Sequence, residues 1–96
     1  MPAEQDDGAP LTAEERGRAA ALGRVWTVWY EDRFERDSEA WPSAWFRDEA
    51  SAKSWAEKQQ TAAGPESFER WTAAPYDLAA PSSPAREVRA ALSALQ

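Results

Sequence analysis

Residues 24–34, Arg-Val-Trp-Thr-Val-Trp-Tyr-Glu-Asp-Arg-Phe, constrain the fold more than any other stretch of the chain. They form the longest run of β-branched and aromatic residues, which favour strands. Alternate side chains of a strand point to opposite faces, and here both faces are apolar at the centre of the run. A strand of this kind is usually central or covered on both faces. We therefore expect a small sheet built on it, with the main helix on one face and a terminal helix or a partner on the other.

The apolar residues are of an unusual kind for a chain of 96 residues, which is the size of one small domain. Alanine occurs 21 times, isoleucine is absent, and leucine and valine are few. Alanine buries little surface, whereas one large aromatic side chain can bury roughly 150–250 Å². We therefore expect most of the six tryptophans to supply the core, and one or two to lie on an exposed or partner-covered face.

Capping signals predict the first two helices. Thr12 and Glu15 have the spacing of a capping box, which predicts a short helix over residues 13–22. Asp48 is well placed as an N-cap and predicts the main helix over residues 49–63, which a Gly-Pro pair then terminates.

Two further strands and a last helix complete the pattern. Residues 41–46 are predicted to form a short or edge strand, because Pro42 has no N–H to donate to a ladder. Residues 67–74 resemble a third strand, which Pro75 is expected to end. A Ser-Pro pair, with serine as N-cap and proline at the first helical position, predicts an amphipathic helix over residues 84–96.

This order of elements predicts an α+β fold. It consists of a small three-stranded, mainly antiparallel sheet with a ββαβ core, one main helix on a face, and short N- and C-terminal helices. Composition divides the chain into a disordered acidic tail, a single α+β domain, a Pro/Ala/Ser linker and a C-terminal amphipathic helix, at residues 1–10, 11–78, 79–83 and 84–96.

Cysteine and histidine are both absent from the sequence. Their absence removes disulfides, thiolate nucleophiles, the usual zinc sites and the imidazole general base. The remaining acid–base candidates are carboxylates clustered after the first strand: Glu31, Asp32, Glu35, Asp37 and Glu39. A short polar loop offers no burial to raise a carboxyl pKa. We therefore expect a protein that is not an enzyme and that uses no cofactor or metal ion.

Charge and hydropathy bear on location and on the class of partner. The net charge of −6 opposes nonspecific binding to nucleic acid. The N-terminus is acidic and polar, unlike a signal peptide, and no apolar run approaches the roughly 20 residues of a membrane span. We expect a cytoplasmic protein with no membrane partner. Nine arginines against two lysines, with no asparagine or isoleucine, indicate a GC-rich coding source such as an actinobacterium or a phage.

Three tryptophans are the candidate partner-binding residues of the sheet. Trp41 and Trp45 flank Pro42 in the predicted edge strand, where a partner can also add a strand of its own. Trp29, in the first strand, is the third.

The C-terminal helix offers a second candidate surface. Val88, Leu92 and Leu95 form a narrow apolar stripe at helical spacing. Either this stripe packs back on the open face of the sheet, or it serves as a docking peptide or a dimerisation helix.

These observations support three hypotheses about function. The first is a small non-catalytic protein-interaction module, such as an adaptor, accessory subunit or inhibitor, whose partner is a larger protein or a second copy of the chain. The second is an acidic mimic of nucleic acid that blocks a nucleic-acid-binding enzyme, although the acids are interleaved with arginine. The third is a single-stranded nucleic-acid binder that stacks bases on tryptophan and arginine.

Overall fold

The computed structural model describes residues 9–33 and 39–95. Most of the predicted acidic tail and part of the loop after the first strand, including Glu35 and Asp37, lie outside these residues. The described elements are three helices and three strands in the order α2 (Ala13–Leu22), β1 (Arg24–Asp32), β2 (Ala40–Phe46), α3 (Glu49–Ala63), β3 (Glu69–Asp77) and α4 (Ala85–Leu95). The α+β prediction with a ββαβ core is confirmed.

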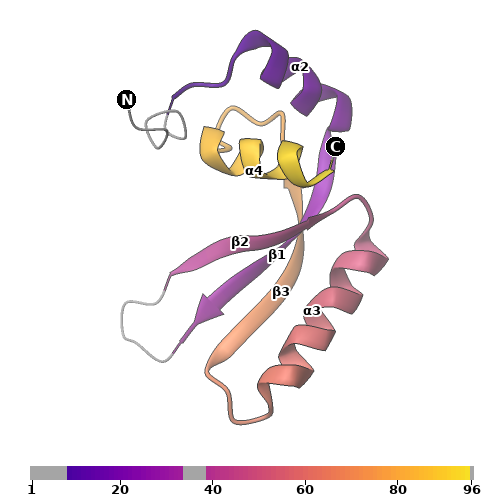
Figure 1. The fold of residues 1–96 in the computed structure, drawn as a ribbon, viewed down its shortest axis with the longest axis vertical. Coiled ribbons are helices and arrows are strands. Elements are labelled where there is room, and N and C mark those ends of the chain that lie inside the picture. Colours follow the sequence, from indigo (N-terminus) through magenta and orange to yellow (C-terminus); the bar gives the residue numbers. More distant parts are fainter. Residues whose placement is uncertain (1–8, 34–38, 96) are drawn as a thin grey trace.

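The long apolar run is the central strand of the sheet. The strand order is β2-β1-β3, and β1 pairs antiparallel with both neighbours. Consequently β2, which contains Pro42, lies at an edge as predicted. Figure 1 shows α2 and α4 together at one end of the molecule and α3 alongside β3. The two terminal helices therefore lie together, apart from the main helix α3.

One face of the sheet packs on α3. Val28, Ala52 and Ala56 are its buried residues. Partly buried hydrophobic side chains surround them: Trp26, Phe46, Trp55, Trp71 and Ala73. The alanines let the helix backbone approach the sheet closely, and the large aromatic rings fill the space on either side. We call this cluster the α3 core.

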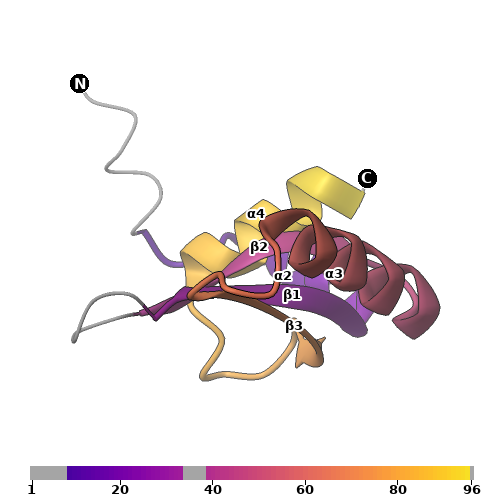
Figure 2. The same cartoon turned by 90° about the horizontal axis from the view of Figure 1, so that it is seen from below.

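The other face packs on α4 and α2. The buried members of this cluster, which we call the α4 core, are Ala19, Val25, Leu78, Val88, Ala91 and Leu92. Leu11, Leu22, Trp45, Tyr76 and Leu95 pack around them. Figure 2 shows α4 passing over β2, which it contacts. The C-terminal helix therefore completes the hydrophobic core of the same domain.

Local signals account for the ends of α2. Thr12 Oγ1 accepts from the N–H of Glu15, and the N–H of Thr12 donates to Glu15 Oε1, as the predicted capping box requires. At the other end Gly23 has a φ of 67°, a value that favours glycine. Its carbonyl accepts from the N–H of Leu78, which joins the start of β1 to the end of β3.

The predicted end of the third strand is wrong. β3 continues beyond Pro75, which lies opposite Trp26, and reaches Asp77. The strand tolerates the proline because β3 is an edge strand, where half of the backbone nitrogens have no strand to donate to. The extra residues bring Tyr76 into the α4 core.

Arg89 of α4 forms hydrogen bonds with residues at the described start of the chain, a set of contacts that we call the Arg89 clamp. Its guanidinium donates to Glu15 Oε2 at 2.9 Å and to the carbonyl oxygens of Ala9 and Pro10, each at 2.9 Å. Glu15 and Arg89 are both about four-fifths shielded from solvent. The last two residues of the predicted tail, Ala9 and Pro10, are thus held by the fold. At the far end of α4, Arg47 donates to the carbonyl of Leu95.

The Arg89 clamp predicts that the free energy of unfolding decreases in acid. The hydrogen bond from Arg89 is the main cause that lowers the pKa of Glu15 from 4.5 to about 2. A carboxyl whose pKa is lower in the folded state stabilises the fold above its unfolded pKa, and that contribution is lost as pH falls from 4.5 towards 2. We expect Arg89→Gln to make urea unfolding less dependent on pH across this range. Arg86→Gln, on the same helix, is the matched control and leaves the dependence unchanged; equal pH dependence in both variants would contradict the role of the clamp.

Candidate functional site

Trp41 is the most conspicuous side chain on the surface of the sheet. Among residues 9–33 and 39–95, the large hydrophobic side chains that are exposed are Trp41, at 49 %, and Phe68, at 56 %. Trp41 is the second residue of the edge strand β2. The expectation that one or two tryptophans lie at the surface is met by this residue, while the other five are partly buried.

The ring of Tyr30 packs against the exposed ring of Trp41. The strand register places Tyr30 opposite both Trp41 and Trp71, and its ring centroid lies 5.1 Å and 5.2 Å from theirs. The hydroxyl of Tyr30 donates to Glu69 Oε2 at 2.6 Å. This hydrogen bond, with burial second, raises the pKa of Tyr30 to about 12. Trp41 therefore rests on a neutral aromatic ring that is fixed on two further sides.

A groove opens beside Trp41. It has a volume of about 360 Å³ and lies between the edge strand and α4. Its lining residues are Trp41, Pro42, Trp45, Arg86, Glu87 and Ala90. We call it the Trp41 groove. Two elements that are distant in the sequence form its walls, and its volume falls within the range of small ligand and peptide sites.

Tyr76 fixes the inner wall of the groove. Its ring meets that of Trp45 edge to face at 4.9 Å, and its hydroxyl donates to Glu87 Oε1 at 2.6 Å. Burial, followed by this hydrogen bond, raises the pKa of Tyr76 well above its usual value. Trp29 approaches the same ring at 6.3 Å. The groove wall is consequently preorganised, and Glu87 already accepts a hydrogen bond from within the protein.

Arg86 differs from the other charged residue of the groove. It forms no hydrogen bond or ion pair with the part of the chain that the structure describes. One turn along the same helix, Arg89 is engaged by Glu15 and by backbone carbonyls. The guanidinium of Arg86 is thus the charge at this groove that is available to a ligand.

The backbone of β2 is poorly suited to strand addition. The pairing with β1 shifts register between Val28 and Trp29, opposite Ser43, and Pro42 lacks an N–H. Ser43 Oγ donates to the carbonyl of Val28, and Thr27 Oγ1 donates to the carbonyl of Ala44. An irregular edge of this kind does not offer a continuous row of backbone donors and acceptors.

The structure sorts the sequence-predicted site residues into two groups. Trp41 and Trp45 both line the groove, but the strand register places Trp41 beside Tyr30 on the α3 face of the sheet and Trp45 beside Thr27 on the α4 face. Trp29 contacts Tyr76 in the inner wall. Val88 and Leu92 are buried in the α4 core, and Leu95 packs against that core. The proposed role of this stripe as a free docking surface is therefore corrected: the described fold follows the other alternative, in which the helix packs back on the sheet, because the stripe completes the core.

The residues that sequence reasoning missed come from the tertiary fold. The sequence identifies Tyr30 only as part of the first strand, because its pairing with Trp41 depends on strand register. Arg86 and Glu87 flank the apolar stripe of α4, but no pattern in the sequence brings them to the edge strand. The helical period signals only that these two residues lie off the buried stripe.

Of the carboxylates considered for catalysis, Glu31, Asp32 and Glu39 lie within the described residues. Glu31 pairs with Arg33 at 2.7 Å, and Glu39 is exposed. The carboxyl pKa shifts that are resolved, for Glu15 and Asp48, are both downward and come from hydrogen bonds. A general acid needs the opposite shift. Within residues 9–33 and 39–95, no group of three or more acidic side chains could hold a metal ion.

Comparison with protein-family models, with curated proteins and with solved structures finds no match to this chain. Within the described ranges, no helix has both the length and the apolar character needed to cross a membrane.

Proposed function

We propose that this chain is a small non-catalytic protein-interaction module that docks on a larger protein through the Trp41 groove. The observation that carries the proposal is a half-exposed tryptophan, held on a fixed tyrosine, at the mouth of a groove. Adaptor, accessory subunit and inhibitor are the roles that such a module fills. A cytoplasmic location and a larger protein as partner belong to the same proposal, and a second copy of the chain is the alternative partner.

Energetics favour Trp41 as the anchor. Tryptophan is enriched among the few interface residues that dominate binding free energy. Anchoring is most effective when little side-chain freedom is lost on binding. The ring of Trp41 is already in contact with Tyr30, at a centroid separation of 5.1 Å. A partner that covers the exposed half of the ring removes apolar surface from water without having to order the side chain first.

The experiment is affinity capture from a lysate of the source organism with Trp41→Ala as the test variant. We expect a stoichiometric partner to be captured by the parent chain and retention to fall at least about tenfold in the variant, as for a hot-spot residue. Phe68→Ala is the matched control, because Phe68 is similarly exposed but does not line the groove. Trp45 is unsuitable for this test because it also packs on the α4 core.

Two outcomes would overturn the proposal. One is a partner captured equally by the parent and Trp41→Ala proteins, both folded by circular dichroism. The other is specific turnover of a substrate by the purified chain, which would contradict its non-catalytic character.

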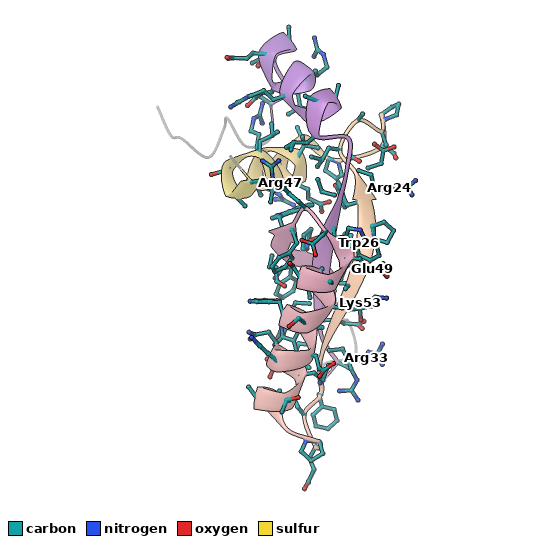
Figure 3. All side chains as sticks on the ribbon, turned by 90° about the vertical axis from the view of Figure 1, so that its right-hand side faces the viewer. Arg24, Trp26, Arg33, Arg47, Glu49 and Lys53 are labelled. Atoms are coloured by element: carbon teal, nitrogen blue, oxygen red, sulfur yellow. The ribbon has the colours of Figure 1, made fainter. Side chains whose placement is uncertain are left out.

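The described surface does not favour the two nucleic-acid hypotheses. Acidic and basic side chains alternate on it: Glu31 pairs with Arg33, and Glu49 pairs with Lys53 at 2.5 Å. Figure 3 shows charges of both signs along that side of the molecule, with Arg24 and Arg33 at the sheet and Glu49 and Lys53 on α3. A mimic of nucleic acid needs a face of one sign, and a single-strand binder needs a cationic groove.

A further inference from the structure

We propose that Trp41, together with carboxylates beside it on the α3 face of the sheet, receives an arginine side chain from a basic segment of the partner. This inference rests on the proposed function and names the chemistry of the partner. Two neighbouring rows of side chains carry it, one aromatic with an exposed end and one acidic.

The first row, which we call the aromatic row, crosses all three strands. Residues directly opposite each other share a face of the sheet, and Tyr30 lies opposite Trp41 on one side and Trp71 on the other. Trp71 packs against the α3 core, so the helix covers that end of the row. Trp41 forms the other end and is 49 % exposed. A cation can therefore reach its indole, the ring that makes the most favourable cation–π contacts.

The second row, which we call the acidic row, consists of Asp32 and Glu69. Asp32 follows Tyr30 by two positions in β1, so it lies on the same face, about 6.8 Å further along the strand. Glu69 lies directly opposite Asp32 in β3. Like charges in this arrangement repel each other and destabilise the pairing. A cation bound beside the row lowers this repulsion, so the geometry favours a positively charged occupant.

Tyr30 connects the two rows. Its hydroxyl donates to Glu69 Oε2 at 2.6 Å. This hydrogen bond, followed by burial, raises the pKa of Tyr30 to about 12, and the charges of Glu69 and Asp32 contribute to the same shift. Glu69 also accepts a hydrogen bond from Ser67. Since a carboxylate offers about four acceptor sites, Glu69 can still accept a charge-assisted hydrogen bond from a guanidinium.

Two described arginines near this end of the sheet belong to its other face. Arg70 lies opposite Glu31, and Arg33 pairs with Glu31 at 2.7 Å. Glu31 comes between Tyr30 and Asp32 in β1, so its side chain points away from the two rows. These arginines are thus grouped with Glu31, while the α3 face carries the acidic row.

A hollow beside the acidic row extends the negative surface. It has a volume of about 620 Å³ and lies where α3 ends. Phe68, which is exposed, is one of its lining residues. The charged side chains that line it are all carboxylates: Asp32, Glu66 and Glu69. The carbonyl groups at the C-terminus of a helix add a partial negative charge. The hollow is therefore complementary to further basic residues of the docking segment.

Arginine suits the two rows better than lysine does. Its guanidinium is planar, so it can stack on an aromatic ring while its N–H groups donate sideways to carboxylates. The ammonium of lysine is a compact and strongly hydrated charge that cannot stack. The combination of an exposed indole with carboxylates on the same face therefore favours arginine.

The test uses synthetic peptides and the purified full-length chain, without the partner protein. The probe is acetyl-Gly-Arg-Gly-Arg-Gly-Arg-Gly-amide. One control peptide has lysine in place of every arginine and keeps the charge. The other has citrulline in place of every arginine and keeps the shape without the charge. Two-dimensional NMR spectra follow the Trp41 indole N–H, and shifts of backbone amides in β1 and β2 give the dissociation constant for every variant.

We expect the probe to shift the Trp41 resonance and to bind about two- to fivefold more tightly than the lysine peptide, the range for an exposed cation–π contact. The citrulline peptide should bind most weakly. Trp41→Ala should remove the preference for arginine over lysine. Glu69→Gln, which can still accept from Tyr30, should weaken binding of both charged peptides about two- to fivefold. Glu14→Gln removes the same charge from α2, at the other end of the molecule (Figure 1), and should bind as the parent does.

Contrary outcomes are equally definite. The proposal is overturned if the probe shifts no Trp41 resonance at millimolar concentration, or if the lysine or citrulline peptide binds as tightly as the probe. It is also overturned if Glu14→Gln weakens binding as much as Glu69→Gln, because the attraction would then come from net charge alone. If the peptides fail while partner capture still depends on Trp41, only the partner chemistry is wrong. If both tests fail, Trp41 is not the docking anchor.

Discussion

Val88→Asp is expected to lower the free energy of unfolding by about 3–5 kcal/mol, the largest loss expected of a single substitution in this chain. Val88 is fully buried in the α4 core. An aspartate there must either bury a charge without a partner or be protonated, and breaking a core in this way costs about 3–5 kcal/mol. A chain of this length has a total stability of roughly 5–14 kcal/mol. Urea unfolding followed by circular dichroism measures the loss.

Ala90→Asp is the matched control for that prediction. Ala90 lies on the exposed side of the same helix, at the groove, so its replacement alters helix propensity and little else. The expected cost is below about 1 kcal/mol. Equal stability losses for the two variants would show that α4 does not pack on the sheet in solution. The apolar stripe would then be available to a partner, as the other sequence-based alternative holds.

Ala52→Phe is expected to destabilise the domain by about 3 kcal/mol. Ala52 is completely buried where α3 meets the sheet, in the same cluster as Val28 and Ala56. A phenyl ring at this position would force the helix away from β1 or drive neighbouring rings from their rotamers, and overpacking of this kind costs about 1–3 kcal/mol and occasionally more. Chemical denaturation gives the difference in unfolding free energy.

Ala50→Phe tests whether the effect comes from packing. Ala50 is exposed in the first turn of the same helix, and a phenyl group there reaches solvent. We expect a change within about 0.5 kcal/mol, as for a surface substitution. If Ala52→Phe is tolerated as well as Ala50→Phe, the close approach of α3 to the sheet is wrong. The pair of variants thus measures what alanine contributes to a core that contains little leucine and no isoleucine.

The tryptophans contribute both to the hydrophobic core and to the candidate site. Five of the six are partly buried and only Trp41 is exposed. Small alanines between the helices and the sheet leave space that large rings fill from the edges. Rings at the edges of a core keep one face near the surface. The same composition that builds the two cores therefore leaves aromatic surface beside the edge strand.

Local signals in the sequence are sufficient to predict the helices and strands and much of their order. The capping box of Thr12 and Glu15 predicted the start of α2, and Asp48 with the Gly-Pro stop predicted the limits of α3. The apolar run of β1 predicted a strand covered on both faces, which the two cores confirm. These features are local, because caps, stops and side-chain alternation act within a few residues. The prediction that Pro75 ends the third strand is wrong for the same reason. It considers only the missing N–H of proline, which costs no ladder hydrogen bond when that nitrogen faces the open edge of the sheet.

The candidate site, by contrast, depends on how the elements pack in three dimensions. Strand register places Tyr30 under Trp41, and the packing of α4 brings Arg86 to the edge strand some 40 positions earlier in the sequence. The apolar stripe of α4 was visible in the sequence, but whether it would meet a sheet or a partner was not. That choice depends on the area that the remaining elements leave uncovered. Periodicity reports which side of an element is apolar, whereas only the complete fold reports what lies against it.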